Sequence, residues 1–172
     1  MIEHHHSIAL RKANSNDAQL LCGLIRNSFR DVAVKFELTP ENCPTHPSNC
    51  REDWIIKDFE RGTIYYLLER SGLPVGCVAI EKATNDLCYL KRLAVLPGER
   101  RKGFGNQLVN HALNTARQWG AKSISIGVIA KQTDLKKWYQ EIGFKEGETK
   151  KFGQLPFSVC FMNYEIKGNI PQ

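Results

Sequence analysis

The spacing of apolar residues along the chain predicts strands and helices in alternation. Apolar residues at every second position, or in short β-branched runs, predict strands over residues 8–12, 64–69, 75–81, 87–95, 123–129 and 157–166. Apolar residues three or four positions apart predict four helices. These helices run from residues 14–17 to about Val34, through the segment that carries Trp54, and over residues 104–119 and 133–142.

Capping and helix-breaking residues set the ends of these elements. Residues 14–17 (Asn-Ser-Asn-Asp) offer several N-caps for the first helix, and Asn49 with Glu52 forms a capping pair for the second. Gly120 and Gly143 stop the third and fourth helices. Three prolines within residues 39–49 prevent regular structure and predict a stiff loop between the first two helices.

The order of elements predicts an α/β fold: a partly antiparallel sheet with helices on its faces. The order is strand, two helices, three strands, helix, strand, helix and one or two strands, so an antiparallel meander is followed by a strand–helix–strand crossover. We expect a single domain over residues 8–167 and a C-terminal tail over residues 168–172. Residues 1–7, which include His4, His5 and His6, are interpreted as a terminal segment or tag remnant.

Composition narrows the function without choosing it. A hydrophobic fraction of 42% in 172 residues is typical of a globular domain, and no apolar run suits a membrane helix or a signal peptide, so we expect a soluble cytoplasmic protein. Six dispersed cysteines predict no disulfide framework. The 24 Lys and Arg residues against 18 Asp and Glu give a net charge of +6, which suits nucleic acid, an anionic surface or a phosphorylated cofactor. The positive charge is the only feature that favours binding to nucleic acid, so we expect no nucleic-acid partner.

The most informative segment is a basic, glycine-containing turn that joins a strand to a helix. Arg100, Arg101 and Lys102 precede Gly103 and Gly105, where the helix begins. Unpaired backbone N–H groups and the positive end of the helix dipole meet at such a point, and glycine leaves room for an anion. The segment predicts a phosphate site, although a solvated basic turn has the same composition.

Two motifs in this order resemble those of the GNAT superfamily of N-acetyltransferases. The first is Arg100-x-x-Gly103-x-Gly105 after a strand that ends Leu-Ala-Val-Leu-Pro, and the second is the helix over residues 135–144, with Tyr139 just before a Gly-Phe ending. The resemblance extends through the element order from about Ile8 to Ile166. It implies a twisted, mostly antiparallel sheet that splays between its fourth and fifth strands, with acetyl-CoA as co-substrate and no metal.

The resemblance also implies which residues hold the cofactor. The pantetheine arm would bond to the backbone of Leu93 and Val95, and the pyrophosphate would rest on the N–H groups of residues 101–106. Gln132 stands where the family often carries an asparagine, and its contact with the cofactor is open. The predicted cofactor residues are Leu93, Ala94, Val95, Arg100, Arg101, Lys102, Gly103, Phe104, Gly105, Asn106 and Gln132.

Tyr139 and Glu81 are the predicted catalytic residues. Tyr139 matches the family tyrosine that gives a proton to the departing CoA thiolate, although a half-buried structural tyrosine is the alternative. Many relatives carry a glutamate base on the strand before the first motif, but Tyr89 takes that place here. Glu81 and Asp86 are the nearest carboxylates, acting directly or through water, and solvated hairpin carboxylates are the alternative interpretation.

The proline-rich loop is predicted to form one wall of the acceptor site. His46 in the loop and Trp54 on the next helix are the candidate acceptor contacts. Cys43, His46 and Cys50 have a spacing that offers three metal ligands, but a fourth ligand and tight cysteine pairs are missing, so we predict no metal site.

The sequence therefore predicts an N-acetyltransferase that moves an acetyl group from acetyl-CoA to a primary amine of a small molecule or protein, by direct attack in a ternary complex. A non-catalytic acyl-CoA-binding regulatory module is the alternative. The acceptor is not identified, and both a monomer and a homodimer are compatible with the sequence.

Overall fold

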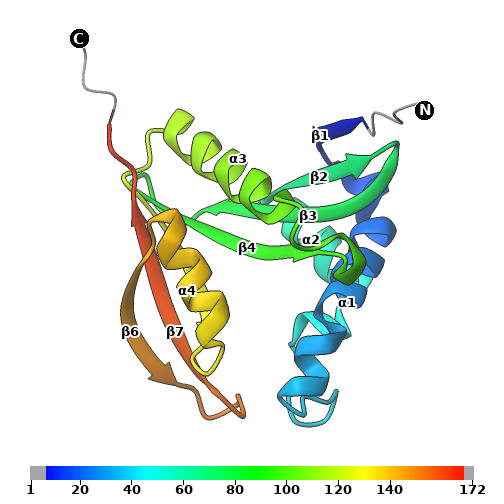
Figure 1. Cartoon of the computed structure of the whole chain (residues 1–172), viewed down its shortest axis with the longest axis vertical. Helices are drawn as coiled ribbons and strands as arrows, with labels where there is room; N and C mark the ends of the chain where they lie inside the picture. Colours follow the sequence, from blue (N-terminus) through cyan, green and yellow to red (C-terminus); the bar gives the residue numbers. More distant parts are fainter. Residues whose placement is uncertain (1–6, 169–172) are drawn as a thin grey trace.

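The structure is a computed structural model that describes residues 7–168, so His4 to His6 lie outside the described part. Its strands are β1 (Ile8–Lys12), β2 (Ile64–Arg70), β3 (Leu73–Lys82), β4 (Leu87–Val95), β5 (Ser123–Ile129), β6 (Lys145–Lys151) and β7 (Ser158–Glu165). Its α-helices are α1 (Ala18–Lys35), α2 (Glu52–Glu60), α3 (Phe104–Gln118) and α4 (Thr133–Ile142) (Figure 1). Short 3₁₀ turns lie at Ser15–Asp17, Pro47–Asn49 and Pro97–Glu99.

The strands form one mixed sheet in the order β1-β2-β3-β4-β5-β7-β6. β1 to β4 pair antiparallel, β4 and β5 pair parallel, and β5, β7 and β6 pair antiparallel. The parallel pair is the one that α3 connects, as the crossover pattern requires. The predicted α/β fold with a partly antiparallel sheet is confirmed.

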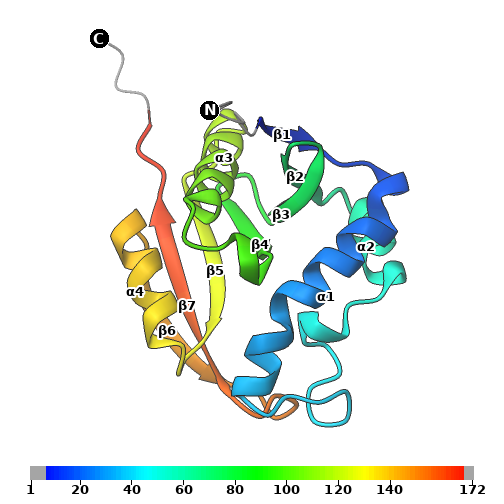
Figure 2. The same cartoon turned by 45° about the vertical axis from the view of Figure 1, so that its right-hand side comes forward.

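Helices cover both faces of the sheet, and the alternation of side chains on β3 shows how. Cys77 and Ala79 pack with α1 and α2, whereas Val78 and Ile80 pack on the other face with α3. Figures 1 and 2 show α1 and α3 on opposite sides of the central strands. No helix within residues 7–168 is long and apolar enough to cross a membrane.

The sheet opens between β4 and β5. The two strands pair only from Leu87 with Ser123 to Tyr89 with Ser125, after which β5 pairs with β7 alone. β4 also carries a bulge, because the register with β3 shifts between Cys77 and Ala79 and Arg92 adopts a positive φ of 50°. The predicted splay is confirmed, and the second half of β4 faces an open space.

Capping residues and apolar periodicity explain where some helices and strands lie and do not explain others. Asn14 caps the first turn: its side chain accepts the Asn16 N–H, and the Asp17 carboxylate accepts the Asn14 N–H. The predicted cap at Asn49 is wrong, because Arg51 is the N-cap residue of α2 and the Asn49 amide donates to Cys43 O at 3.1 Å. The seven residues of β6 are all exposed and show no alternation of apolar and polar residues. The apolar periodicity therefore did not predict where this strand lies.

Candidate functional site

The turn before α3 presents backbone N–H groups toward one point. Arg101 and Gly103 have positive φ values of 61° and 83°, which bends the chain sharply into the helix. The first bond of α3 runs from Gln107 N to Gly103 O at 3.1 Å, so the amides of Phe104, Gly105 and Asn106 precede the intrahelical ladder. This is the geometry that binds phosphate groups.

A cavity of about 590 Å³ lies against this turn and extends along the end of β4. The predicted cofactor residues that line it are Leu93, Ala94, Val95, Arg100, Arg101, Gly103, Gly105, Asn106 and Gln132. Ser28 on α1 lines the cavity as well, and its Oγ is buried with no hydrogen-bond partner within residues 7–168. A Cβ on Gly105 would lie 3.2 Å from Trp138, another lining residue. An unpaired hydroxyl and a glycine cradle both fit a polar ligand in this cavity.

Arg100 connects α1 to the turn before α3 through hydrogen bonds. Its Nε donates to Val95 O at 3.1 Å, its Nη2 donates to Ser28 O at 2.6 Å, and its guanidinium pairs with Asp31. The hydrogen bond from the Arg100 guanidinium to the Asp31 carboxylate holds the pKa of Asp31 below its usual range. Arg100 therefore contributes to the site first by positioning the wall of the cavity.

Two predicted cofactor residues do not line the cavity. Lys102 donates to Glu99 at 2.9 Å and to Gly98 O at 3.2 Å. The Phe104 side chain is buried in the core beneath α3, so only its backbone amide belongs to the turn.

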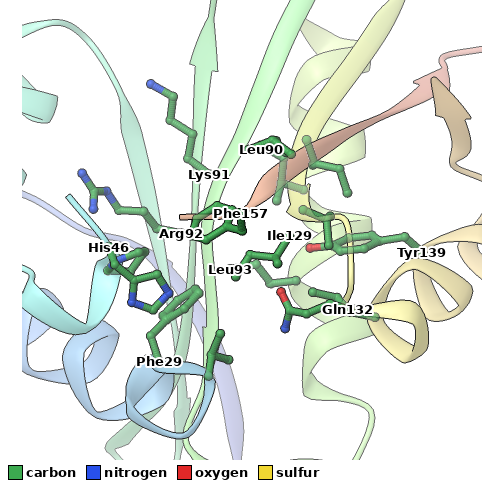
Figure 3. Close-up of a pocket in the computed structure, with 17 residues that line it drawn as sticks. Phe29, His46, Leu90, Lys91, Arg92, Leu93, Ile129, Gln132, Tyr139 and Phe157 are labelled. Carbon is green, nitrogen blue, oxygen red and sulfur yellow. The ribbon is translucent and has the colours of Figure 1, made fainter. Parts of the chain in front are cut away.

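A second cavity, of about 360 Å³, adjoins the first where β4 and β5 diverge. The two cavities share Phe29, Val32, Leu93, Gln132 and Leu135 in their linings. Figure 3 shows Tyr139 and Gln132 on one side of the space, and Phe29, His46 and Arg92 on the other. A ligand that lies along β4 and a second ligand from the open side would therefore meet at these shared residues.

Tyr139 lies in the wall of the second cavity. Its ring packs edge-on against Trp138 and Phe144, at centroid distances of 4.8 and 5.3 Å, and its hydroxyl points into the space (Figure 3). Burial raises the pKa of Tyr139, so its phenol keeps its proton at neutral pH.

His46 lies in the same cavity, on the proline-rich loop. Its Nδ1 accepts the Ser48 N–H at 3.3 Å and lies 2.7 Å from Ser48 Oγ, and its ring contacts Phe29 edge-on. Burial lowers the pKa of His46 to about 4, so the ring is neutral at pH 7. With Nδ1 accepting, the proton of the neutral ring is assigned to Nε2.

The remaining predicted residues lie outside both cavities. Glu81 pairs with Lys91 and accepts from Thr63 Oγ1 at 3.2 Å. Asp86 pairs with Lys122. Trp54 packs with the core formed by α1 and α2, so the structure does not bring Glu81 or Trp54 to the site.

No group of three or more His, Cys, Asp or Glu side chains within residues 7–168 is arranged to hold a metal ion. Cys43 and Cys50 are free and buried. Burial raises the pKa of both thiols, that of Cys50 to about 12, and a protonated thiol is a poor metal ligand.

Sequence reasoning missed several residues of the walls. Phe29 and Val32 belong to the apolar stripe of α1, which predicts only core packing, yet both line the two cavities. Lys91 and Arg92 line the second cavity from β4. A polar pair inside an otherwise apolar strand was the available signal for these two.

A mixed sheet that opens beside a phosphate-type turn is the arrangement that the resemblance to the acetyl-CoA-dependent class of transferases implies. The comparisons agree with this class: residues 28–144 match the model of the acetyltransferase (GNAT) family. The chain belongs to the GNAT family.

Relatives and solved structures agree with this assignment. The chain is 26% identical to the uncharacterized N-acetyltransferase YjgM of Escherichia coli, over 70% of this chain and 74% of that protein. It is 29% identical to an uncharacterized N-acetyltransferase of Methanocaldococcus jannaschii over 57% of this chain, a match that spans 45% of that protein. The PaiA N-acetyltransferase of Thermoplasma acidophilum, solved with coenzyme A, has a TM-score of 0.77 at 17% identity and covers 92% of this chain and 99% of its own. The ribosomal-protein-S18-alanine N-acetyltransferase of Escherichia coli has a TM-score of 0.75 at 14% identity, over 96% and 99%.

Proposed function

We propose that this chain uses acetyl-CoA to acetylate a primary amine by direct attack within a ternary complex. The observation that carries the proposal is the pair of adjoining cavities with shared walls. One cavity lies on the phosphate-type turn and the other opens beside Tyr139. Two ligands placed in this way meet without a covalent enzyme intermediate.

In this proposal the chain holds acetyl-CoA mainly through its backbone. The amides of residues 101–106 receive the pyrophosphate at the start of α3, and the edge of β4 at Leu93, Ala94 and Val95 receives the pantetheine arm. Arg101 supplies positive charge from the wall of the cavity, and Gln132 contributes from the opposite wall. Lys102 acts from outside the cavity, where it pairs with Glu99.

The proposed reaction forms one bond and breaks one. The amine nitrogen attacks the thioester carbonyl carbon, the carbon–sulfur bond breaks with its electron pair on sulfur, and the nitrogen loses a proton to water. Tyr139 donates its phenolic proton, or a hydrogen bond, to the departing sulfur, since burial keeps the phenol protonated. Water also returns a proton to Tyr139 where the phenol has donated its own.

The amine has no carboxylate base beside it. No Asp or Glu among the described residues lines either cavity. A role for Glu81 as base therefore requires water between its carboxylate and the amine. We propose that the amine binds as the free base, so kcat/KM rises with pH through the pKa of the acceptor.

Titration calorimetry with acetyl-CoA, followed by thiol-release assays over a panel of amines, tests the proposal. Binding with turnover supports an N-acetyltransferase. Binding without turnover over a broad panel supports the regulatory module, which the absence of a lining carboxylate favours. No binding of acetyl-CoA overturns the proposal.

A further inference from the structure

The second cavity has positively charged lining residues and no negatively charged ones among the described residues. The positively charged residues are Lys91 and Arg92. Lys91 is paired with Glu81, which lies outside the cavity, so Arg92 supplies the excess positive charge. A cavity that received a polyamine or a lysine-rich peptide would place these cations beside further ammonium groups. The charge of the wall therefore indicates the acceptor class.

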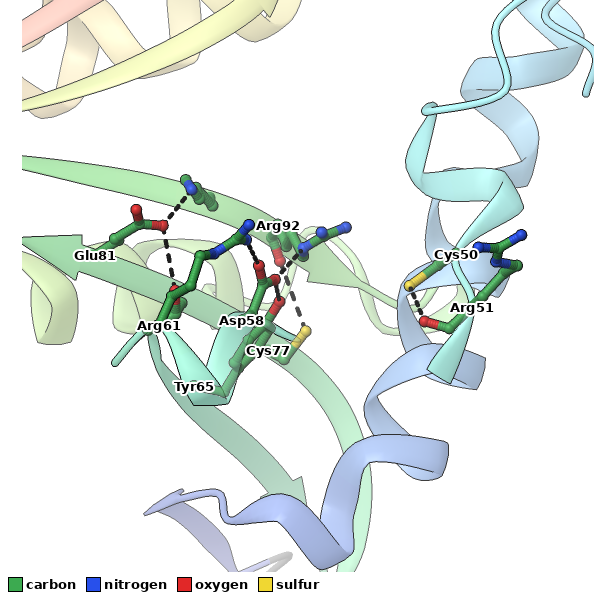
Figure 4. Close-up of polar contacts among 10 residues, drawn as sticks. Cys50, Arg51, Asp58, Arg61, Tyr65, Cys77, Glu81 and Arg92 are labelled. Atoms are coloured by element: carbon green, nitrogen blue, oxygen red, sulfur yellow. Dashed lines mark hydrogen bonds and ion pairs between the residues drawn. The ribbon is translucent and has the colours of Figure 1, made fainter. Parts of the chain in front are cut away.

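Arg92 is fixed so that one edge of its guanidinium stays unpaired. Its Nε donates to Asp58 at 3.1 Å (Figure 4). Its guanidinium lies 5.8 Å from the Trp54 ring centroid. The side chain is only 18% exposed, yet neither Nη atom has a hydrogen-bond partner within residues 7–168. Two parallel N–H groups held in this way match the geometry of a carboxylate or a phosphate.

Asp58 does not neutralise the charge of Arg92, because it is shared. Its side chain is 2% exposed and also accepts from Arg61 and from the Tyr65 hydroxyl. Two guanidinium groups therefore surround one carboxylate, which leaves a net positive charge. Of these two arginines, Arg92 lines the cavity and Arg61 does not.

His46 adds a neutral donor to the same cavity. Because Nδ1 accepts from Ser48, the ring presents Nε2–H. His46 and Arg92 both line this cavity, on the side away from Tyr139 (Figure 3). The polar groups at this wall are therefore donors, and the chemistry they recognise is an oxyanion.

The rest of the cavity is mostly apolar, with Phe29, Leu90, Phe157 and Val159 among its lining residues. We propose that the acceptor is an amine with an apolar body that also carries an oxyanion, a carboxylate or a phosphate, bound by Arg92. This inference rests on the proposed acetyl transfer and names the acceptor class for it.

Matched acceptors test the inference without altering the protein. Three acceptors share a ring and a primary amine: phenylalanine, phenylalaninamide and 2-phenylethylamine. Only phenylalanine carries an anion. The aminophosphonate analogue of phenylalanine carries a phosphonate in place of the carboxylate and so shows which of the two anions the site prefers. Each is assayed at a pH above its own amine pKa, so that the free base is compared. We expect kcat/KM for an anionic member to exceed that for the amide by about tenfold or more, the usual effect of a charged hydrogen bond.

The variants Arg92→Gln and Arg61→Gln form a matched pair. Both remove one guanidinium from Asp58, but only the first removes the cavity cation. Arg92→Gln should bring kcat/KM for the anionic acceptor to within about threefold of kcat/KM for the amide. Arg61→Gln should leave this ratio of kcat/KM values unchanged. Thermal unfolding and acetyl-CoA affinity of both variants show that the fold and the cofactor site persist.

The outcomes separate the inference from the function on which it rests. Loss of acetyl-CoA binding in the wild type would overturn the proposed function. If acetyl-CoA binds, the same acceptors are compared by turnover or, where none reacts, by calorimetry on the CoA complex. Anionic members that react or bind no better than the amide overturn the acceptor class, as does a ratio that Arg92→Gln leaves unchanged.

Discussion

A negative charge at Gly103 should prevent the cofactor from binding, and the variant pair Gly103→Glu and Gly103→Gln isolates that charge. Gly103 is the N-cap residue of α3 and has a φ of 83°. Nothing lies within 4 Å of a Cβ built on it, so neither side chain meets a neighbour at its first atom. Glu and Gln have nearly equal volumes, so the two variants share the same bulk and the same backbone strain.

The magnitude follows from charge and distance. A left-handed backbone costs a residue with a Cβ about 1–2 kcal/mol, and this cost lowers Tm equally in both variants. A carboxylate about 6 Å from a phosphate charge, at an effective dielectric constant of about 20, is repelled by about 3 kcal/mol, which corresponds to about 100-fold in Kd. The effect should shrink at high salt, since exposed charges are screened over about 10 Å at 0.1 M.

Titration calorimetry with acetyl-CoA at two salt concentrations measures the effect. Gly103→Gln should lose some affinity through bulk and strain, and Gly103→Glu should bind about 100-fold more weakly than Gly103→Gln. Gly153→Glu adds the same charge at another open glycine, outside both cavities, and should bind as the wild type does. Equal affinities for the Glu and Gln variants at Gly103 would refute the anion site at this turn.

Three further predictions follow from the structure. Tyr139→Phe should lower kcat about 100-fold with unchanged acetyl-CoA affinity, while Tyr164→Phe, outside both cavities, should leave kcat unchanged; equal rates for both variants would contradict the donor role. Since burial lowers the pKa of His46 to about 4, its contribution to stability is present above about pH 6.5 and is lost as pH falls from there toward 4. His46→Asn, measured by Tm between pH 7.5 and 4.5, should lose less stability on acidification than the wild type, and parallel curves would argue against this. Gly76→Ala should destabilise the fold by about 1–3 kcal/mol, because its Cβ would lie 2.9 Å from Ala94 O, and an unchanged Tm would count against that clash.

Most of the residues that the sequence assigns to the cofactor line one cavity of the structure, because they are close together in the chain. The turn, the helix start and the glycines are consecutive residues, so their spacing carries the geometry directly. The strands and helices with clear apolar periodicity were also predicted within a few residues. The position of β6 was not predicted, because its side chains are exposed and mostly charged. Its pairing with β7 also depends on residues that are distant in the sequence.

The acceptor side could not be predicted in the same way, because it is assembled from distant segments. The loop with His46, helix α1, strand β4 and helix α4 come together only in the folded chain. A candidate such as Glu81 looks suitable on the meander, but its partner Lys91 is ten residues away, and no sequence pattern shows that the two side chains pair. Trp54, a predicted acceptor contact, does not line the second cavity, and its ring centroid lies 5.8 Å from the guanidinium of Arg92, which does.

The bulge in β4 explains how one strand lines both cavities. In a regular strand, successive side chains point to opposite faces, yet Leu90, Lys91, Arg92 and Leu93 all line the second cavity. The positive φ of Arg92 and the shifted register interrupt the alternation at this point. Leu93 also lines the first cavity, together with the following residues Ala94 and Val95. Substitutions at Lys91 and Arg92 therefore alter the wall of the second cavity while Ala94 and Val95 keep their pairing with β3. In the proposed function, the preference for an acceptor can then change independently of acetyl-CoA binding.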